Sequence, residues 1–252
     1  EIVPSVERPI EYMSVNVQGT LRVLEASREA MVRKVVYAAS SSCYGVAKIP
    51  TPEDHAIDLR YPYALSKYQG EQACFHWAQV YGLPVNSIRI FNAYGTRSRA
   101  SGAYGAVFGT FLRQKLANEP FTVVGDGTQK RDFVYATDVV SAFFFAGIES
   151  ASGEMWNVGC GNPISINRVV ELLEGDVVYI PKRPGEPDCT WADISKITRD
   201  LNWRPKVSID EGIQRLLHEI SYWKDAPLWT PESIKAATDS WFIALSESDK
   251  RQ

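Results

Sequence analysis

Short apolar runs alternate along this chain with longer segments in which apolar residues recur every three or four positions. The short runs predict buried strands, and they lie at residues 33–40, 85–91, 121–124, 155–158 and 177–180. The longer segments predict helices, and they lie at residues 16–30, 63–81, 107–116, 137–148, 166–173, 210–223 and 231–245. Strands and helices that alternate in this way are typical of an α/β protein with a parallel sheet.

The charge of the chain bears on the kind of partner it binds. Lys and Arg number 27 against 30 Asp and Glu, which leaves a formal net charge of −3. A chain without a basic excess is a poor candidate for binding nucleic acid or an anionic membrane surface. The longest apolar run covers residues 139–148, about half of the roughly 20 residues that a membrane-spanning helix needs. We therefore expect neither partner.

The cysteines indicate a reducing compartment. Cys43, Cys74, Cys160 and Cys189 are spread along the chain without a CxxC pair or a neighbouring histidine cluster. A structural zinc site and a disulfide scaffold both need other spacings. We expect free thiols, no bound metal and a cytoplasmic location.

One candidate for acid–base chemistry is the pair Tyr63 and Lys67, which share a face of a predicted helix. A lysine ammonium beside a phenol favours the phenolate and lowers the tyrosine pKa, which lets the phenol take a proton from an alcohol. The same spacing also occurs in ordinary surface pairs. A second pair, Tyr44 and Lys48, falls in a predicted loop, where a four-residue spacing has no fixed geometry.

A run of three serines, Ser40 to Ser42, follows the strand predicted at residues 33–40. Ligands of open parallel sheets bind beyond the carboxyl ends of the strands. A hydroxyl group at this place can hydrogen-bond the alcohol that Tyr63 deprotonates. The plainer alternative is a serine-rich turn between a strand and a loop.

Six segments, taken in order, resemble those of the extended short-chain dehydrogenase/reductases, and among them the nucleotide-sugar 4-epimerases. They are residues 16–20 (NVQGT), 40–45 (SSSCYG), 61–67 (YPYALSK), 89–95 (RIFNAYG), 125–133 (GDG…RDF) and 183–193 (RPGE…WAD). The resemblance implies a Rossmann-like parallel sheet that binds NAD and a smaller, interleaved substrate-binding domain. On this basis we assign residues 1–98 and 133–160 to the first domain. Residues 99–132 and 161–252 form the second, with a helical extension at its C-terminal end.

The same resemblance implies roles for individual residues. Tyr63 would be the base, Lys67 would hold the nicotinamide ribose, and Ser40 would bond the 4-hydroxyl group of the sugar. Together with Tyr63 and Lys67, the residues that line NAD would be Asn16, Ala38 and Phe91. The residues that bind the nucleotide sugar would be Ser42, Asn92, Arg131, Arg183, Glu186 and Thr190.

Within this second set the expected contacts differ. Arg131 and Arg183 would hold the diphosphate, because a guanidinium fork meets two phosphate oxygens at once. Glu186 would lie at the ribose of the nucleotide. Thr190 would face the 2-substituent of the sugar, where a small residue admits an N-acetyl group.

The reaction type depends on Ser41 and Ser42. Related 4,6-dehydratases and decarboxylases carry a carboxylate within this segment, and here both positions are serine. We therefore expect 4-epimerisation of a UDP-hexose, either plain or N-acetylated. The open alternatives are a dehydratase or decarboxylase of the same fold, and a non-catalytic binding protein on a truncated reductase fold.

One family feature does not occur in these residues. The glycine fingerprint GxxGxxG, which cradles the dinucleotide pyrophosphate, is not found in the sequence. We expect that about the first quarter to third of the fold is absent from this chain, which by itself would bind NAD weakly. The resemblance also predicts a homodimer formed through the helices that contain residues 10–30 and 63–81.

Overall fold

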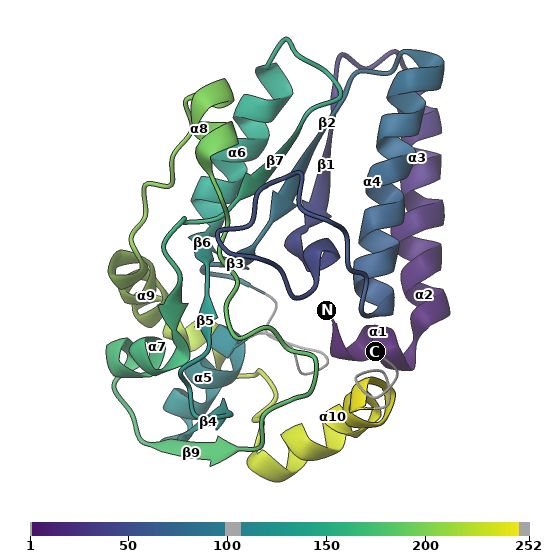
Figure 1. Ribbon diagram of the computed structural model, residues 1–252. Helices are drawn as coiled ribbons and strands as arrows, with labels where there is room; N and C mark the ends of the chain where they lie inside the picture. The colour runs from purple at the N-terminus through teal and green to yellow at the C-terminus, as the bar shows by residue number, and fades with distance from the viewer. Residues whose placement is uncertain (1, 99–106, 247–252) are drawn as a thin grey trace.

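A three-stranded parallel sheet forms one half of the computed structural model, which describes residues 2–98 and 107–246. Its strands follow the order β1–β2–β7, with the bounds Val35–Ser40, Val85–Ile90 and Met155–Val158. Ser40 pairs with Ile90, and Ile90 with Val158, so the carboxyl ends of the strands meet at one edge. Helices cover both faces of this sheet (Figure 1).

On one face lie α3 and α4, and on the other α6 and α8 (Figure 1). The helices of this half are α1 (Val3–Glu7), α2 (Pro9–Met13), α3 (Gly19–Glu29), α4 (Pro62–Tyr81), α6 (Ala136–Ile148) and α8 (Ser195–Leu201). A π-helical turn, Ser14–Gln18, joins α2 to α3, and a 3₁₀ helix, Ser41–Tyr44, follows β1. Helix α4 begins with a proline at its first position and ends at Gly82, whose φ of 67° suits a glycine.

The other half contains three small strand pairs. They are β3 (Asn92–Tyr94) with β6 (Phe133–Tyr135), β4 (Phe121–Val124) with β9 (Val177–Ile180), and the antiparallel β5 (Lys130–Arg131) with β8 (Ile164–Ser165). The helices are α5 (Val107–Leu116), α7 (Ile166–Leu173), α9 (Ile209–His218) and α10 (Pro231–Ser246), and a 3₁₀ helix, Ile220–Trp223, follows α9.

Each half is built around a large apolar cluster. The first includes Phe111 and Phe121 and joins α5, β4, α7 and α9. The second includes Ile88 and Trp203 and lies between the sheet, α6 and α8. Each fully buried side chain of this kind contributes roughly 1.5–3 kcal/mol. Helix α8 thus packs on the sheet, although its residues fall in the range 161–252. The division into two domains stays a prediction, and residues 99–106, which begin the second range, lie outside the described residues.

The α/β fold with parallel strands is confirmed, and the structure has a strand or helix at each predicted place. The prediction of one helix over residues 210–223 is wrong. Helix α9 ends at His218, and the chain continues as a 3₁₀ turn that buries Trp223. Among the residues that the structure describes, none of the helices is long and apolar enough to span a membrane.

Candidate functional site

Two of the three predicted catalytic residues meet at the carboxyl end of β1. The Oγ atom of Ser40 accepts hydrogen bonds from the Ser42 backbone N–H at 3.2 Å and from the Ser42 hydroxyl at 2.9 Å. The side chain of Tyr63, in the first turn of α4, lies close enough to Ser40 for the serine hydroxyl to act on the Tyr63 pKa. The serine run is therefore both the cap of a 3₁₀ helix and a partner of the candidate base.

The electrostatic state of Tyr63 differs from the prediction. Burial raises the pKa of Tyr63, and the Ser40 hydroxyl opposes this shift. The ammonium of Lys67 lies over another ring, with Nζ 4.5 Å from the centre of Tyr37, and burial lowers the pKa of Lys67. The prediction that Lys67 lowers the pKa of Tyr63 is wrong for this structure, because burial raises that pKa and the group that opposes the shift is Ser40.

The first turn of α4 is held from two sides. The Tyr63 backbone N–H donates to the buried hydroxyl of Ser5 on α1 at 3.1 Å. The Ser66 hydroxyl donates to the Tyr63 carbonyl at 2.9 Å and accepts from the Asn16 side-chain amide at 2.9 Å. Asn16 lies in the π-helical turn, a rare geometry that is frequent at functional sites. These bonds fix the backbone that carries the base.

The remaining predicted NAD residues lie along the same edge of the sheet. Phe91 directly follows β2 and is buried against the ring of Tyr44, with ring centres 6.4 Å apart. Ala38 is exposed on β1, the outer strand of the three-stranded sheet. Phe91 thus follows the strand next to β1 at the same sheet edge, while Asn16 contacts α4 through Ser66 and Lys67 lies over Tyr37 of β1.

The predicted diphosphate residues form an ion-pair cluster. The Arg131 Nη2 donates to Glu186 Oε1 at 2.9 Å, and the Arg183 Nε lies 3.3 Å from Glu186 Oε2. Arg131 also donates from Nη1 to the Pro187 carbonyl at 2.9 Å. Two guanidinium groups therefore converge on one carboxylate. Each guanidinium has five N–H donors, so the two arginines together carry more donors than the single carboxylate of Glu186 can accept.

Thr190 and Asn92 are in direct contact. The Thr190 hydroxyl donates to Asn92 Oδ1 at 2.9 Å and accepts from the Asp132 backbone N–H at 3.3 Å. The buried Asp132 carboxylate accepts from the backbone N–H groups of Ala192 at 2.9 Å and Gly161 at 3.1 Å. Burial raises the pKa of Asp132, and these backbone donors oppose the shift. Asp132 belongs to the segment at residues 125–133 that carries the family resemblance, but the sequence did not indicate that its carboxylate joins separate loops.

Tyr61 connects the base with the arginine cluster. Burial raises the pKa of Tyr61, and the charges of Glu186 and Arg131 as well as Tyr63 act on its hydroxyl. Tyr61 is only two residues before Tyr63, and its hydroxyl lies within electrostatic range of both groups of candidate residues. Sequence reasoning quoted this tyrosine in the segment at 61–67 but assigned it no role.

A second buried network, also missed, lies behind the site. Arg89 donates from Nη2 to Glu71 Oε2 at 2.7 Å and from Nη1 to the Tyr44 hydroxyl at 2.9 Å. The Tyr44 hydroxyl donates to Asn157 Oδ1 at 2.8 Å. Arg89 lies on β2, Glu71 on α4, Tyr44 on the 3₁₀ helix that follows β1, and Asn157 on β7. The network therefore fixes the strand ends on which the candidate site is built.

Comparison with known proteins agrees with this geometry. The family described as "NAD dependent epimerase/dehydratase family" matches residues 2–159. A UDP-glucuronate 4-epimerase of Thermodesulfobacterium geofontis is 34% identical over 239 residues, which cover 92% of this chain and 69% of that protein.

Two solved structures are similar as well. A UDP-glucose 4-epimerase of Thermotoga maritima with UDP-glucose has a TM-score of 0.81 and 32% identity, covering 89% of this chain and 74% of that one. A UDP-glucuronic acid 4-epimerase of Bacillus cereus with UDP-glucuronic acid and NAD has a TM-score of 0.77 and 30% identity, covering 82% and 68%.

Proposed function

Because this chain belongs to the NAD dependent epimerase/dehydratase family, we propose that the protein inverts the 4-hydroxyl group of a UDP-hexose through a 4-keto sugar. The observation that carries this proposal is the contact between Tyr63 and Ser40 at the carboxyl end of β1, with the arginine cluster beyond Tyr61. The similarity to UDP-sugar 4-epimerases supports the substrate class.

The chain's residues suit the nicotinamide end of NAD. The Lys67 ammonium and the Asn16 amide are donors of the kind that ribose hydroxyls accept, and Phe91 adds an apolar wall. NAD, when bound, supplies the acceptor that removes hydride from C4 and returns it. The glycine turn for its pyrophosphate is not found among the 252 residues, so we assign only the nicotinamide end to this chain.

The chain's own residues would handle the proton and the substrate. Tyr63 takes the proton of the 4-hydroxyl group as hydride leaves C4, while Ser40 hydrogen-bonds the same oxygen. Arg131 and Arg183 hold the diphosphate, about which the 4-keto sugar turns its other face. Tyr63 then returns the proton to the oxygen as hydride returns to C4, so the overall reaction is redox-neutral.

The serine run favours epimerisation over the alternatives. A dehydratase must also remove the C5 proton and protonate the leaving 6-hydroxyl group, which takes additional acid and base groups. Here the Ser42 hydroxyl donates to Ser40 at the place where such relatives carry a carboxylate. The contact between Ser40 and Tyr63 likewise disfavours a non-catalytic binding protein.

The reaction is tested with the full-length protein, NAD and a UDP-hexose, followed by NMR. UDP-glucose and UDP-N-acetylglucosamine are expected to give their 4-epimers, and UDP-glucuronate is included because of the similar relatives. A 4-keto-6-deoxy sugar or released carbon dioxide would establish one of the alternatives instead.

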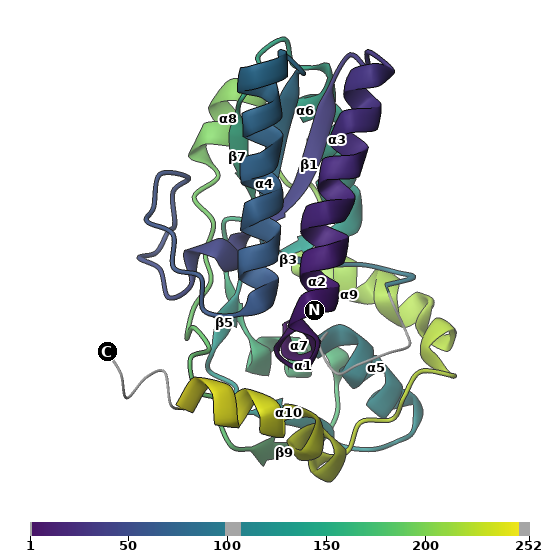
Figure 2. The ribbon, with the colours of Figure 1, turned by 90° about the vertical axis from the view of Figure 1, so that its right-hand side faces the viewer.

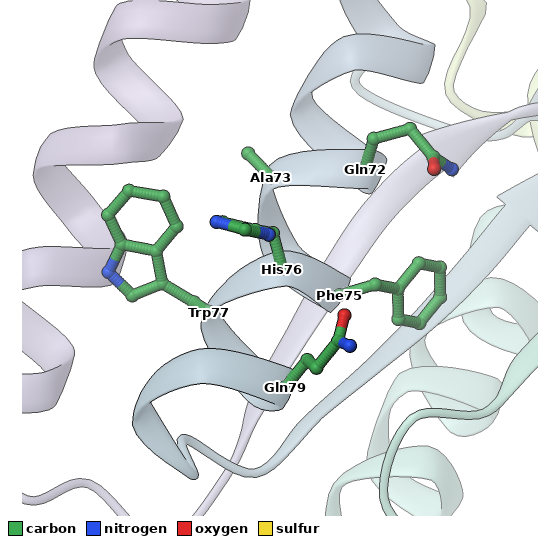
Figure 3. Close-up of a pocket in the computed structure, with 6 residues that line it drawn as sticks. All are labelled: Gln72, Ala73, Phe75, His76, Trp77 and Gln79. Carbon is green, nitrogen blue, oxygen red and sulfur yellow. The ribbon is translucent and has the colours of Figure 1, made fainter.

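We also propose a homodimer formed through α2, α3 and α4. On the helical segment formed by α2, the π-helical turn and α3, the side chains of Ile10, Val15 and Val23 are between 60% and 79% exposed. On α4, a hollow of about 490 Å³ is lined by Gln72, Ala73, Phe75, His76, Trp77 and Gln79 (Figure 3). Apolar side chains on this face suit burial against a second copy. Val23→Glu should then convert a dimer to a monomer in light scattering.

Two further assignments belong to this proposal. The four cysteines are free thiols in the structure, which suits a cytoplasmic protein. The division into an NAD-binding domain (1–98 and 133–160) and a substrate-binding domain (99–132 and 161–252) suits a site at which the end of β1 belongs to the first domain and the loop that carries Arg183 to the second. Fractionation and limited proteolysis test these two assignments.

A further inference from the structure

One side chain of helix α10, the indole of Trp241, contacts both the loop that carries Arg183 and the segment that leads to Tyr63. Trp241 is only 4% exposed, and its Nε1–H donates to the Pro184 carbonyl at 2.9 Å. Its ring lies 5.6 Å from the ring of Tyr61, tilted by 41°. Figure 2 shows α10 below α1.

Both contacts lead directly to residues of the site. Pro184 follows Arg183, whose guanidinium lies 3.3 Å from Glu186. Tyr61 precedes Tyr63 by two residues. Trp241 therefore touches the loop that would hold the diphosphate and the chain that leads into the base.

Helix α1 adds a second route to the same turn of α4. Val3 on α1 packs with Trp241 and Leu245 in one apolar cluster. Two residues along the same helix, the Ser5 hydroxyl accepts the Tyr63 backbone N–H at 3.1 Å. A change at Trp241 is therefore expected to affect both the loop at residues 181–190, which carries Arg183, and the start of α4.

We propose that Trp241 is a positioning residue for the nucleotide diphosphate, because its indole N–H fixes the carbonyl next to Arg183. The loop at residues 181–190 is irregular and includes Gly185 with a φ of 68°, so a side-chain donor from outside limits where Arg183 can point. The inference rests on the proposed function for the identity of the ligand. It places part of substrate binding on a helix that lies beyond the family match at residues 2–159.

The test compares two tryptophan-to-phenylalanine substitutions in the full-length protein. W241F keeps an aromatic ring beside Tyr61 and Val3 but removes the N–H donor. Trp223 is 0% exposed, and its Nε1 has no hydrogen-bond partner within the described residues, so W223F shortens a buried indole without removing a hydrogen bond. We expect W241F to weaken UDP binding in calorimetry about three- to tenfold, and W223F to leave it within twofold.

Turnover separates positioning from chemistry. With UDP-glucose, W241F should raise KM by the same factor and leave kcat within twofold, since the phenyl ring keeps the packing against Tyr61 and Val3 that supports the start of α4. Equal UDP affinities of W241F, W223F and the parent would overturn the inference. A parent that binds UDP but gives no 4-epimer would overturn the proposed function and leave the inference standing.

A measurement on the unmodified protein covers the case in which W241F does not fold. In protein with ¹⁵N-labelled tryptophan, UDP should shift the indole N–H signal of Trp241 and leave that of Trp223 in place. An unshifted Trp241 signal at saturating UDP would overturn the inference.

Discussion

Two arginine clusters, one buried and one partly exposed, differ in how their charges are matched. In the network behind the site, Arg89 on β2 and Glu71 on α4 face each other one to one, and their side chains are 3% and 1% exposed. In the cluster of the proposed site, Arg131 and Arg183 share Glu186, and the three side chains are 11%, 17% and 28% exposed.

The difference separates a structural ion pair from a binding site. The Arg89 network is closed to ligands because it is buried, and Ser87 and Tyr44 add hydrogen bonds to it at 2.7 and 2.9 Å. The cluster of Arg131 and Arg183 has donors beyond those that one carboxylate can use and partial access to solvent, as an oxyanion ligand needs. The same residue type thus serves stability in one place and recognition in the other.

The largest expected effect comes from breaking the closed pair. Arg89→Met leaves the Glu71 carboxylate buried without its cation, so the free energy of unfolding should fall by about 3–5 kcal/mol. Urea unfolding measures the loss. Adding Glu71→Leu should recover most of it, because replacing both partners removes the stranded charge. A single variant as stable as the parent would contradict the closed-network interpretation.

One substitution made in both regions should give opposite results. Tyr63→Phe removes the proposed base and should lower kcat at least ~10²-fold, with a stability change below about 1 kcal/mol. Tyr44→Phe strands buried groups on Arg89 and Asn157 and should cost about 1–3 kcal/mol of stability, with kcat within a few-fold. Steady-state kinetics and urea unfolding of both variants decide the matter. Similar kinetics for the two would remove Tyr63 from the mechanism.

The arginine cluster is tested by Arg183→Met. Loss of a charge-assisted contact to the diphosphate should weaken UDP binding about tenfold or more, while stability changes little because the side chain is partly exposed. Arg199→Met is the matched control, since Arg199 is 69% exposed and pairs with its neighbour Asp200. If both variants bind UDP as the parent does, Arg183 does not belong to the site.

The sequence predicted the parts of this fold that depend on local signals. The start and the end of helix α4 are both marked in the sequence, by Pro62 and Gly82. The contact of Ser40 with Tyr63 follows because β1 ends, and α4 begins, at the same edge of the sheet. The carboxylate shared by Arg131 and Arg183 joins β5 to a distant loop, and no local pattern shows such a pairing. The raised pKa of Tyr63 also depends on burial by the whole fold. Helices α1 and α2 have five residues each, too few to show a period.

A narrower effect is expected at Thr190, where the resemblance places a gate for the 2-substituent. Thr190→Tyr should lower turnover of UDP-N-acetylglucosamine about tenfold relative to UDP-glucose, because the ring fills the space of the acetamide. The substitution also removes the hydroxyl that donates to Asn92. Thr190→Val removes this hydroxyl without the added ring and is the control, so an equal loss on both substrates in both variants would exclude the gate.

The smallest effect concerns the stability cost of the buried ammonium of Lys67. Burial lowers the pKa of Lys67 below its ordinary 10.5. At a pH between the folded and the unfolded pKa, the unfolded chain therefore keeps the Lys67 proton while the folded chain loses it. The cost is complete below the folded pKa and disappears as the pH rises toward 10.5. Lys67→Met should therefore raise the thermal midpoint at pH 7 while abolishing activity, and the gain should shrink as the pH approaches 10. Lys48→Met makes the same change in the other Tyr–Lys pair, at an exposed side chain, and should leave the midpoint unaltered at both pH values. If the two variants melt alike across this range, burial does not set the state of Lys67.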